Sequence, residues 1–231
     1  MSLEPTDPTS ARLPETPALS IVEARVLGCL IEKEFSTPDI YPLSLNALVN
    51  ACNQKNNRDP VLALGTGEVE IALGHLRQRR LAALVTGGDA RVPKYKQTLD
   101  NTHPVDPSSR ALLGELLLRG PQTTASLRSN AERLCPMPDH AEVEQLLTDL
   151  SAREAAALVQ KLPRQPGQKE GRWAQLFTGL PDESERLTAR PPVAAEAALP
   201  SAVEDRLRAL ETQVAELRAE LQRLRSELGG S

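Results

Sequence analysis

The feature that most constrains this chain is an internal repeat. The segments GEVEIALGHLRQRRLAALV (residues 67–85) and AEVEQLLTDLSAREAAALV (residues 141–159) are identical at ten of nineteen positions, with a constant offset of 74 and no gap. Similarity at a fixed offset indicates a duplicated structural unit. We therefore expect two copies of one small fold, with the same order of elements in each copy.

Helical patterns precede each copy of the repeat. Residues 20–34 begin with the Ser-x-x-Glu spacing of a capping box and continue with apolar side chains three and four residues apart. Residues 106–120 begin with Asp-Pro, which is typical of a capped helix start, and continue in the same way. A short second helix is expected in each copy, over residues 44–52 and 124–134.

Short runs with strand character follow each copy, over residues 81–99 and 155–179, and a glycine-containing turn divides each run in two. Three helices followed by a hairpin is the order of a winged helix-turn-helix. We therefore predict a mainly α fold with small β-hairpins (α+β class). One winged-helix domain is expected over residues 20–100 and a second over residues 101–180.

The sequence from about residue 20 to residue 179 also resembles a known family. The segments EARVLGCLIEKE, TPDIYPLSLNALVNACNQKNNRDPV (residues 37–61), GEVE and RVPKYKQ are similar to those of the bacterial YceH-like family of uncharacterised proteins. The resemblance implies two winged-helix domains, in agreement with the internal repeat. It implies no particular activity, ligand or catalytic residue.

The two ends of the chain have other compositions. Residues 1–19 are rich in proline, threonine and acids, which predicts a disordered tail, and residues 181–202 form a Pro/Ala-rich linker. Residues 203–229 place apolar side chains at heptad a and d positions, which predicts a coiled-coil helix and a homodimer. The predicted dimerisation residues are Val203, Leu207, Leu210, Val214, Leu217, Leu221, Leu224 and Leu228. A trimer and a single helix packed on its own protein are the alternatives.

Composition and motifs limit the classes of function. The net charge is −4, and the three cysteines form no Cys-x-x-Cys pair, which argues against a disulfide framework or a zinc cluster. Because no leader and no apolar run of bilayer length is present, we expect a cytoplasmic protein. The histidines lack metal-ligand spacing, and no P-loop or nucleophile-elbow pattern occurs. We expect a non-enzymatic protein without catalytic residues, metal or cofactor.

Basic residues suggest that the chain is a dimeric DNA-binding protein similar to a transcription regulator. The predicted outward faces of the third helices lack the arginines that commonly bind guanine, but cations gather near the end of the first of these helices and on both wings. Such cations either bind phosphates of double-stranded DNA or serve solubility alone. The predicted nucleic-acid-binding residues are Gln54, Lys55, Asn57, Arg58, Arg77, Arg91, Lys94, Lys96, Lys161, Arg164, Lys169 and Arg172.

The stretch ACNQKNNRDP (residues 51–60) lies where the first copy is longer than the second. Alignment of the first and third helices of the copies leaves twelve additional residues in the first copy, about eight of them between its second and third helices. Asparagines and Asp-Pro in such a place are typical of turns. The polar and cationic side chains of the same loop suggest contacts with DNA beside the third helix. The sequence leaves both interpretations open.

A second hypothesis for the whole chain is a protein-interaction adaptor with an unidentified protein partner. Tandem winged helices also act as docking surfaces in larger complexes, a comparison at the level of the fold alone. The acids near the start of each third helix would oppose a polyanion, whereas they would not oppose a protein partner.

Overall fold

The computed structural model describes residues 18–85, 92–154, 156–164 and 167–179, which all belong to one compact unit. Arg91, residues 1–17 of the predicted tail, the linker and the heptad segment lie outside the described residues, so the predictions for them stay predictions. Within the described ranges, no helix combines the length and the apolar character that a bilayer crossing requires.

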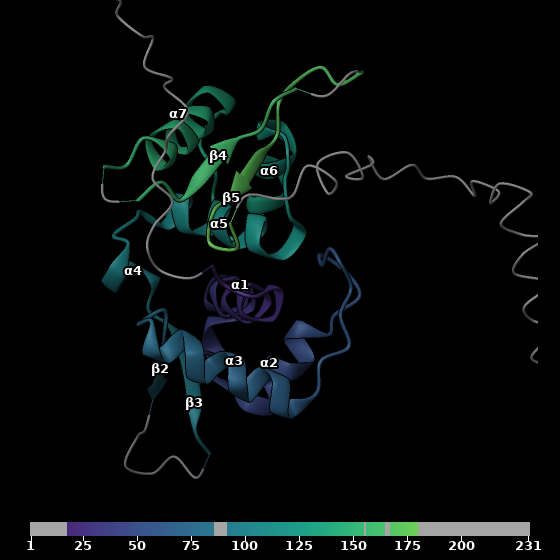
Figure 1. Cartoon of the computed structure of the whole chain (residues 1–231), viewed down its shortest axis with the longest axis vertical. Helices are drawn as coiled ribbons and strands as arrows, with labels where there is room; N and C mark the ends of the chain where they lie inside the picture. The colour runs from purple at the N-terminus through teal and green to yellow at the C-terminus, as the bar shows by residue number, and fades with distance from the viewer. Residues whose placement is uncertain (1–17, 86–91, 155, 165–166, 180–231) are drawn as a thin grey trace, which may run out of the picture. The chain divides into compact units, whose positions relative to one another are not determined.

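The first repeat places its helices before a hairpin, as the sequence predicts (Figure 1). Its elements are, in chain order, α1 (Ile21–Ser36), the 3-10 turn η1 (Pro38–Ile40), β1 (Leu43–Ser44), α2 (Leu45–Cys52), α3 (Thr66–Gln78), β2 (Ala82–Val85) and β3 (Lys94–Gln97). The strands form one sheet in the order β1-β3-β2, with β3 antiparallel to both neighbours.

The second repeat follows the same order after the short helix α4 (Leu99–Thr102). Its elements are α5 (Pro107–Arg119), α6 (Thr124–Ala131), α7 (His140–Ser151), β4 (Val159–Lys161) and β5 (Trp173–Gln175). Strands β4 and β5 pair antiparallel, and Gln122 bridges to Trp173 much as β1 pairs with β3 in the first repeat. The predicted α+β class, helices with small antiparallel sheets, is confirmed.

Two helices start at the predicted capping residues, Ser20 and Asp106, and α7 starts in the same way at Asp139. The hydroxyl of Ser20 accepts a hydrogen bond from the Glu23 N–H at 3.2 Å, and the Glu23 carboxylate accepts one from the Ser20 N–H at 2.7 Å. The carboxylates of Asp106 and Asp139 each accept from the N–H three residues later, at 3.0 and 2.9 Å. These bonds satisfy N–H groups that the first turn of a helix leaves without a partner.

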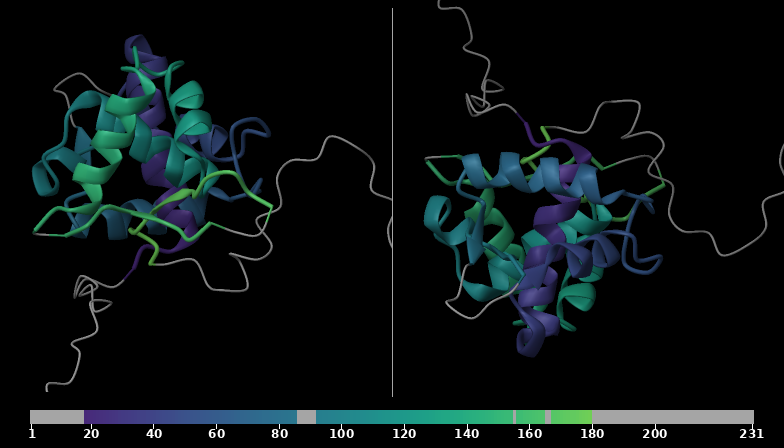
Figure 2. Two further views of the ribbon diagram at one scale, coloured as in Figure 1. Left: turned by 90° about the horizontal axis from the view of Figure 1, so that it is seen from above. Right: turned by 90° about the horizontal axis from the view of Figure 1, so that it is seen from below.

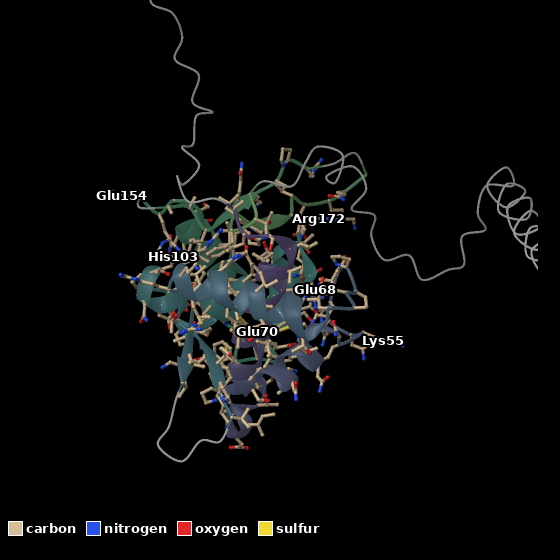
Figure 3. The ribbon with its side chains drawn as sticks, turned by 60° about the horizontal axis from the view of Figure 1, so that its bottom comes forward. Lys55, Glu68, Glu70, His103, Glu154 and Arg172 are labelled. Carbon is tan, nitrogen blue, oxygen red and sulfur yellow. The ribbon has the colours of Figure 1, made fainter. Side chains whose placement is uncertain are left out.

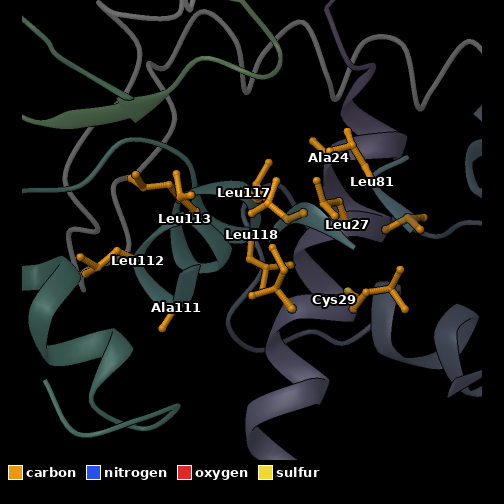
Figure 4. Close-up of a cluster of buried hydrophobic side chains, with 14 of the residues drawn as sticks. Ala24, Leu27, Cys29, Leu81, Ala111, Leu112, Leu113, Leu117 and Leu118 are labelled. Carbon is orange, nitrogen blue, oxygen red and sulfur yellow. The ribbon is translucent and has the colours of Figure 1, made fainter. Parts of the chain in front are cut away.

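The two repeats pack on one another through their first helices, α1 and α5 (Figure 4). Gly28 and Gly114 occupy corresponding positions in these helices. A Cβ atom at Gly28 would lie 2.9 Å from Cγ of Leu118, and a Cβ atom at Gly114 would lie 2.8 Å from Cγ2 of Ile31. Glycine at both positions therefore permits a helix contact that side chains there would push apart.

Helix α1 lies between elements of both repeats (Figure 2). Its residues are buried around the whole circumference over Glu23–Glu32, including Arg25 and the two carboxylates. The sequence pattern predicts a single apolar face for this helix. The second repeat covers the opposite face, so charged side chains that would otherwise face water lie in the interior. Such groups need partners inside the protein, because an unpaired buried charge is costly.

The folded unit begins inside the predicted disordered tail. Leu19 is 5% exposed, and its N–H donates to the Phe177 carbonyl at 2.6 Å. Leu19, at the end of the predicted tail, therefore belongs to the folded unit, because it is buried in the core and its backbone is bonded to the end of the second repeat.

Candidate nucleic-acid interface

The inserted loop between α2 and α3, residues 53–65, turns Arg58 into the interior. The Arg58 side chain is 0% exposed, and its Nη2 lies 2.6 Å from Oε2 of Glu32 on α1. The same guanidinium donates from Nε to the Ala51 carbonyl at 3.1 Å and from Nη2 to the Gln54 side chain at 3.0 Å. The prediction that Arg58 contacts DNA does not agree with this position, because its donors are used within the protein.

The inserted loop also contacts the second repeat. The Asp59 N–H donates to the Leu118 carbonyl at 2.9 Å, and Arg119 donates to the Asn57 side chain. Asn57 has a φ of 59°, in the left-handed region that asparagine tolerates better than most residues. The turn interpretation of this loop fits the structure, and the loop links the first repeat to the second.

Charged side chains from both repeats meet beside the inserted loop. Arg133 Nη2 lies 3.1 Å from Glu32 and 2.5 Å from Glu115, and Arg119 Nε lies 3.1 Å from Glu115. We call Glu32, Arg58, Glu115, Arg119 and Arg133 the inter-repeat cluster. Its two buried carboxylates are offset by three guanidiniums, and this pairing is what makes the burial tolerable.

The two carboxylates of the inter-repeat cluster have opposite pKa shifts. Burial by itself opposes ionisation of Glu32, but the hydrogen bond and charge of Arg58 outweigh it and hold the pKa of Glu32 below its ordinary value. Burial dominates at Glu115 and raises its pKa, despite the guanidiniums of Arg133 and Arg119. The ion pair with Arg58 therefore stabilises the ionised form of the Glu32 carboxylate.

Exposed cations gather on the hairpin of the first repeat. Lys94 and Lys96 alternate with Tyr95 along β3, so both lysines project from one face of the sheet while Tyr95 packs toward the core. Lys55 in the inserted loop and Arg77 near the end of α3 are exposed as well. Among the described residues, none of these four cations has an ion-pair partner.

The hairpin of the second repeat differs, because its first lysine is neutralised. Lys161 pairs with Glu144 of α7, and its ammonium nitrogen lies 5.3 Å from the centroid of the Trp173 ring. Glu144 also accepts hydrogen bonds from Thr124 and from Trp173 Nε1, the latter at 3.4 Å. Burial opposes ionisation of Glu144, but the hydrogen bonds from Lys161, Thr124 and Trp173 outweigh it and lower its pKa.

The remaining cations predicted for the second repeat are spread over its hairpin. Arg164 and Lys169 are exposed, and Arg164 donates to the Lys169 carbonyl at 3.4 Å. Arg172, the residue before β5, is half-buried (Figure 3). The structure therefore does not bring Lys161, Arg164, Lys169 and Arg172 together as one set of free cations.

Helix α3 would direct its outward face into a DNA groove in a winged helix. The residues that the sequence pattern places inward, Val69, Ala72, Leu73 and Leu76, are buried. Glu68 and Glu70 lie on the exposed side of this helix (Figure 3), together with Ile71, which is 63% exposed. This face is acidic at its start and apolar at its middle, which does not favour a polyanion.

Comparison with known proteins places the sequence of both repeats in a family. The family model described as "Protein of unknown function, DUF480" matches residues 19–168, which include most of both repeats and the whole inserted loop. The chain belongs to this family.

Relatives within the family cover most of the chain. A UPF0502 protein of Geotalea daltonii is 57% identical over 163 residues, 71% of this chain and 74% of the relative. A UPF0502 protein of Aeromonas hydrophila is 47% identical over 214 residues, 91% of this chain and 96% of the relative. The UPF0502 protein YceH of Escherichia fergusonii is 43% identical over 216 residues, 91% of this chain and 98% of the relative. The resemblance to the YceH-like family is thereby confirmed.

Cysteine positions in this family member agree with a packing role. Cys29 and Cys52 are buried, and Cys135 is half-buried. The hydrogen bond to Cys29 and burial together raise the pKa of Cys52, which disfavours the nucleophilic thiolate at neutral pH. Within the described ranges, no three His, Cys, Asp or Glu side chains are grouped so that they could hold a metal ion.

Proposed function

We propose that this chain is a non-enzymatic DNA-binding protein with two winged-helix modules, of which the first binds the phosphates of duplex DNA. The observation that carries the proposal is the pair of exposed lysines on β3, Lys94 and Lys96, which lack ion-pair partners within the described part of the chain. Strands β2 and β3 form the hairpin that would be the wing of such a module. A lysine without a neighbouring carboxylate gains most from displacing a counterion of DNA.

The first repeat is the better candidate for this binding. Lys55 adds an exposed cation in the inserted loop (Figure 3), and Gln54 beside it is exposed and uncharged. In the second repeat, Lys161 must give up Glu144 before it can reach a phosphate. Each such exchange reduces the net gain from a phosphate contact.

We propose a homodimer on the basis of the heptad pattern in residues 203–229. Two chains would present two sets of β3 lysines to one duplex. Joining two weak phosphate-binding surfaces raises the overall affinity, because the second contact becomes intramolecular.

A protein-docking function is the second candidate, and Ile71 is the observation that favours it. A large apolar side chain that is 63% exposed on a helix face is more typical of a protein interface than of a phosphate-binding surface.

Binding of the full chain to a random DNA duplex over a series of salt concentrations distinguishes the two functions. Phosphate binding predicts that log Kd changes linearly with log salt, with a slope of about 0.9 for each phosphate neutralised. Absence of binding at low salt, or a slope near zero, would contradict DNA binding and leave the docking function.

A further inference from the structure

The outward face of α3 carries a stripe of uncharged residues. Helical spacing aligns Gly67, Ile71, Gly74 and Gln78 on the side opposite the buried Val69. A Cβ atom at Gly67 or Gly74 would meet no described atom within 4 Å, so the described part of the chain leaves both glycines uncovered. Ile71 is therefore the large apolar side chain of this stripe, and it projects between two glycines that have no side chain.

Charged residues flank this stripe with a definite polarity along the helix. Glu68 and Glu70 lie near the start of α3, whereas His75 and Arg77 lie near its end (Figure 3 shows the two glutamates). Helical spacing places Glu70 and Arg77 on one side of the stripe, and Glu68 and His75 on the other. All four residues are exposed.

The outward face of α3 is complementary to the same face of a second copy that runs in the opposite direction. With a two-fold axis near residues 72–73, Ile71 faces Gly74 of a second copy and Glu70 faces its Arg77. Glu68 and His75 also come near one another, but within each chain Glu68 accepts a hydrogen bond from the Gly65 N–H at 2.8 Å and His75 Nδ1 lies 2.7 Å from Glu23. The charge complementarity is therefore that of Glu70 with Arg77. In a parallel pair, Glu70 would face Glu68 of the second copy and Arg77 would face its His75, so the acids of the two helices would meet one another. We propose that α3 binds α3 of a second copy of this chain in the antiparallel direction.

The shape of the stripe agrees with this occupant. Insertion of an isoleucine side chain into the space beside a glycine is knobs-into-holes packing. The two-fold axis produces this contact twice, once for each chain. DNA fits the same face less well, because Glu68 and Glu70 would approach phosphates. A single helix pair buries less surface than the ~1,000 Å² of a stable interface. The contact is therefore a weak one, which a second connection between the chains would reinforce.

Cysteine cross-linking of the full chain tests this contact. The Ile71→Cys variant, treated with a short bismaleimide in the absence of nucleic acid, should give several-fold more covalent dimer than Ile40→Cys. Ile40 is a matched control because it is 60% exposed, close to the 63% of Ile71, but lies on η1. The unchanged chain measures the background from Cys135, since Cys29 and Cys52 are buried. Equal yields from the Ile71 and Ile40 variants would overturn the proposal.

Charge reversal tests the antiparallel direction. In the Ile71→Cys background, Glu70→Arg should reduce the cross-linked dimer, and the further change Arg77→Glu should restore it. A reduction without restoration, or no reduction, would overturn the antiparallel arrangement. Because Lys94 and Lys96 are absent from this contact, their replacement by alanine should leave the cross-link unchanged, which separates self-association from DNA binding.

Discussion

The guanidinium of Arg58 lies 2.6 Å from the carboxylate of Glu32, and neither side chain is more than 2% exposed. Glu32 belongs to α1, whereas Arg58 belongs to the loop that lengthens the first repeat. Arg133 of the second repeat approaches the same carboxylate at 3.1 Å. The inserted loop therefore does two things at once: it neutralises a charge on the central helix and ties the two repeats together.

Replacement of Arg58 by methionine should lower the free energy of unfolding by about 3 kcal/mol, because it leaves Glu32 buried with only part of its compensation. Urea denaturation followed by circular dichroism measures the change. Lys55→Met is the control: Lys55 is exposed in the same loop, and its loss should change stability by less than about 0.5 kcal/mol. Equal effects of the two substitutions would contradict the buried position of Arg58.

Glu32→Gln should show a pH dependence with a definite sign. The pKa of Glu32 is lowered in the folded state, so its contribution is fully present above the unfolded value of about 4.3 and is lost as the pH falls through the lower folded value. The stability difference between the unchanged chain and Glu32→Gln should therefore be largest near pH 7 and shrink below about pH 4. Denaturation at a series of pH values measures it, and a difference that stays constant would refute the pairing.

Gly28→Ala should destabilise the chain by about 1–3 kcal/mol, because the new methyl group would overlap Leu118 at the contact of α1 with α5. Gly74→Ala is the matched control in a helix. A methyl group there meets no described atom within 4 Å, and alanine favours the helix by up to about 1 kcal/mol. Thermal denaturation of dilute samples should separate the two variants in opposite directions. A stabilising effect of Gly28→Ala would contradict the close approach of the helices.

Local sequence patterns predicted much of the fold. The repeat predicted the order of elements, and the caps at Ser20 and Asp106 form the hydrogen bonds that their spacing indicates. These features depend on residues three or four apart, so periodicity and capping chemistry suffice to find them.

The inter-repeat cluster was not predictable in the same way. Arg58 and Glu32 are separated by 26 residues, and Arg133 comes from the other repeat. One signal was available: Arg25 and Glu32 lie seven residues apart, on the same side of α1 as Cys29. Cysteine is a residue type that is mostly buried, so Cys29 between Arg25 and Glu32 indicates that another element covers this otherwise polar face of α1. Periodicity does not say which element covers it.

Glu144→Gln should increase the affinity for duplex DNA, because it releases Lys161 from its ion pair. Glu154→Gln is the control, since it removes the same charge from an exposed position (Figure 3) for which no ion pair is present among the described residues. Fluorescence anisotropy with a labelled duplex at low salt compares the two. Equal increases for the two variants would mean that net charge alone governs binding, and a larger increase for Glu154→Gln would likewise contradict a part for Lys161.

The decisive measurement for phosphate binding by β3 is the salt dependence of duplex binding by a Lys94→Ala/Lys96→Ala double variant. Loss of two phosphate contacts should reduce the slope of log Kd against log salt by about 2 for each chain bound and weaken binding at low salt. A Lys161→Ala variant, which removes a lysine already paired with Glu144, should change the slope much less. If the double variant has the same slope as the unchanged chain, the β3 lysines do not bind DNA phosphates.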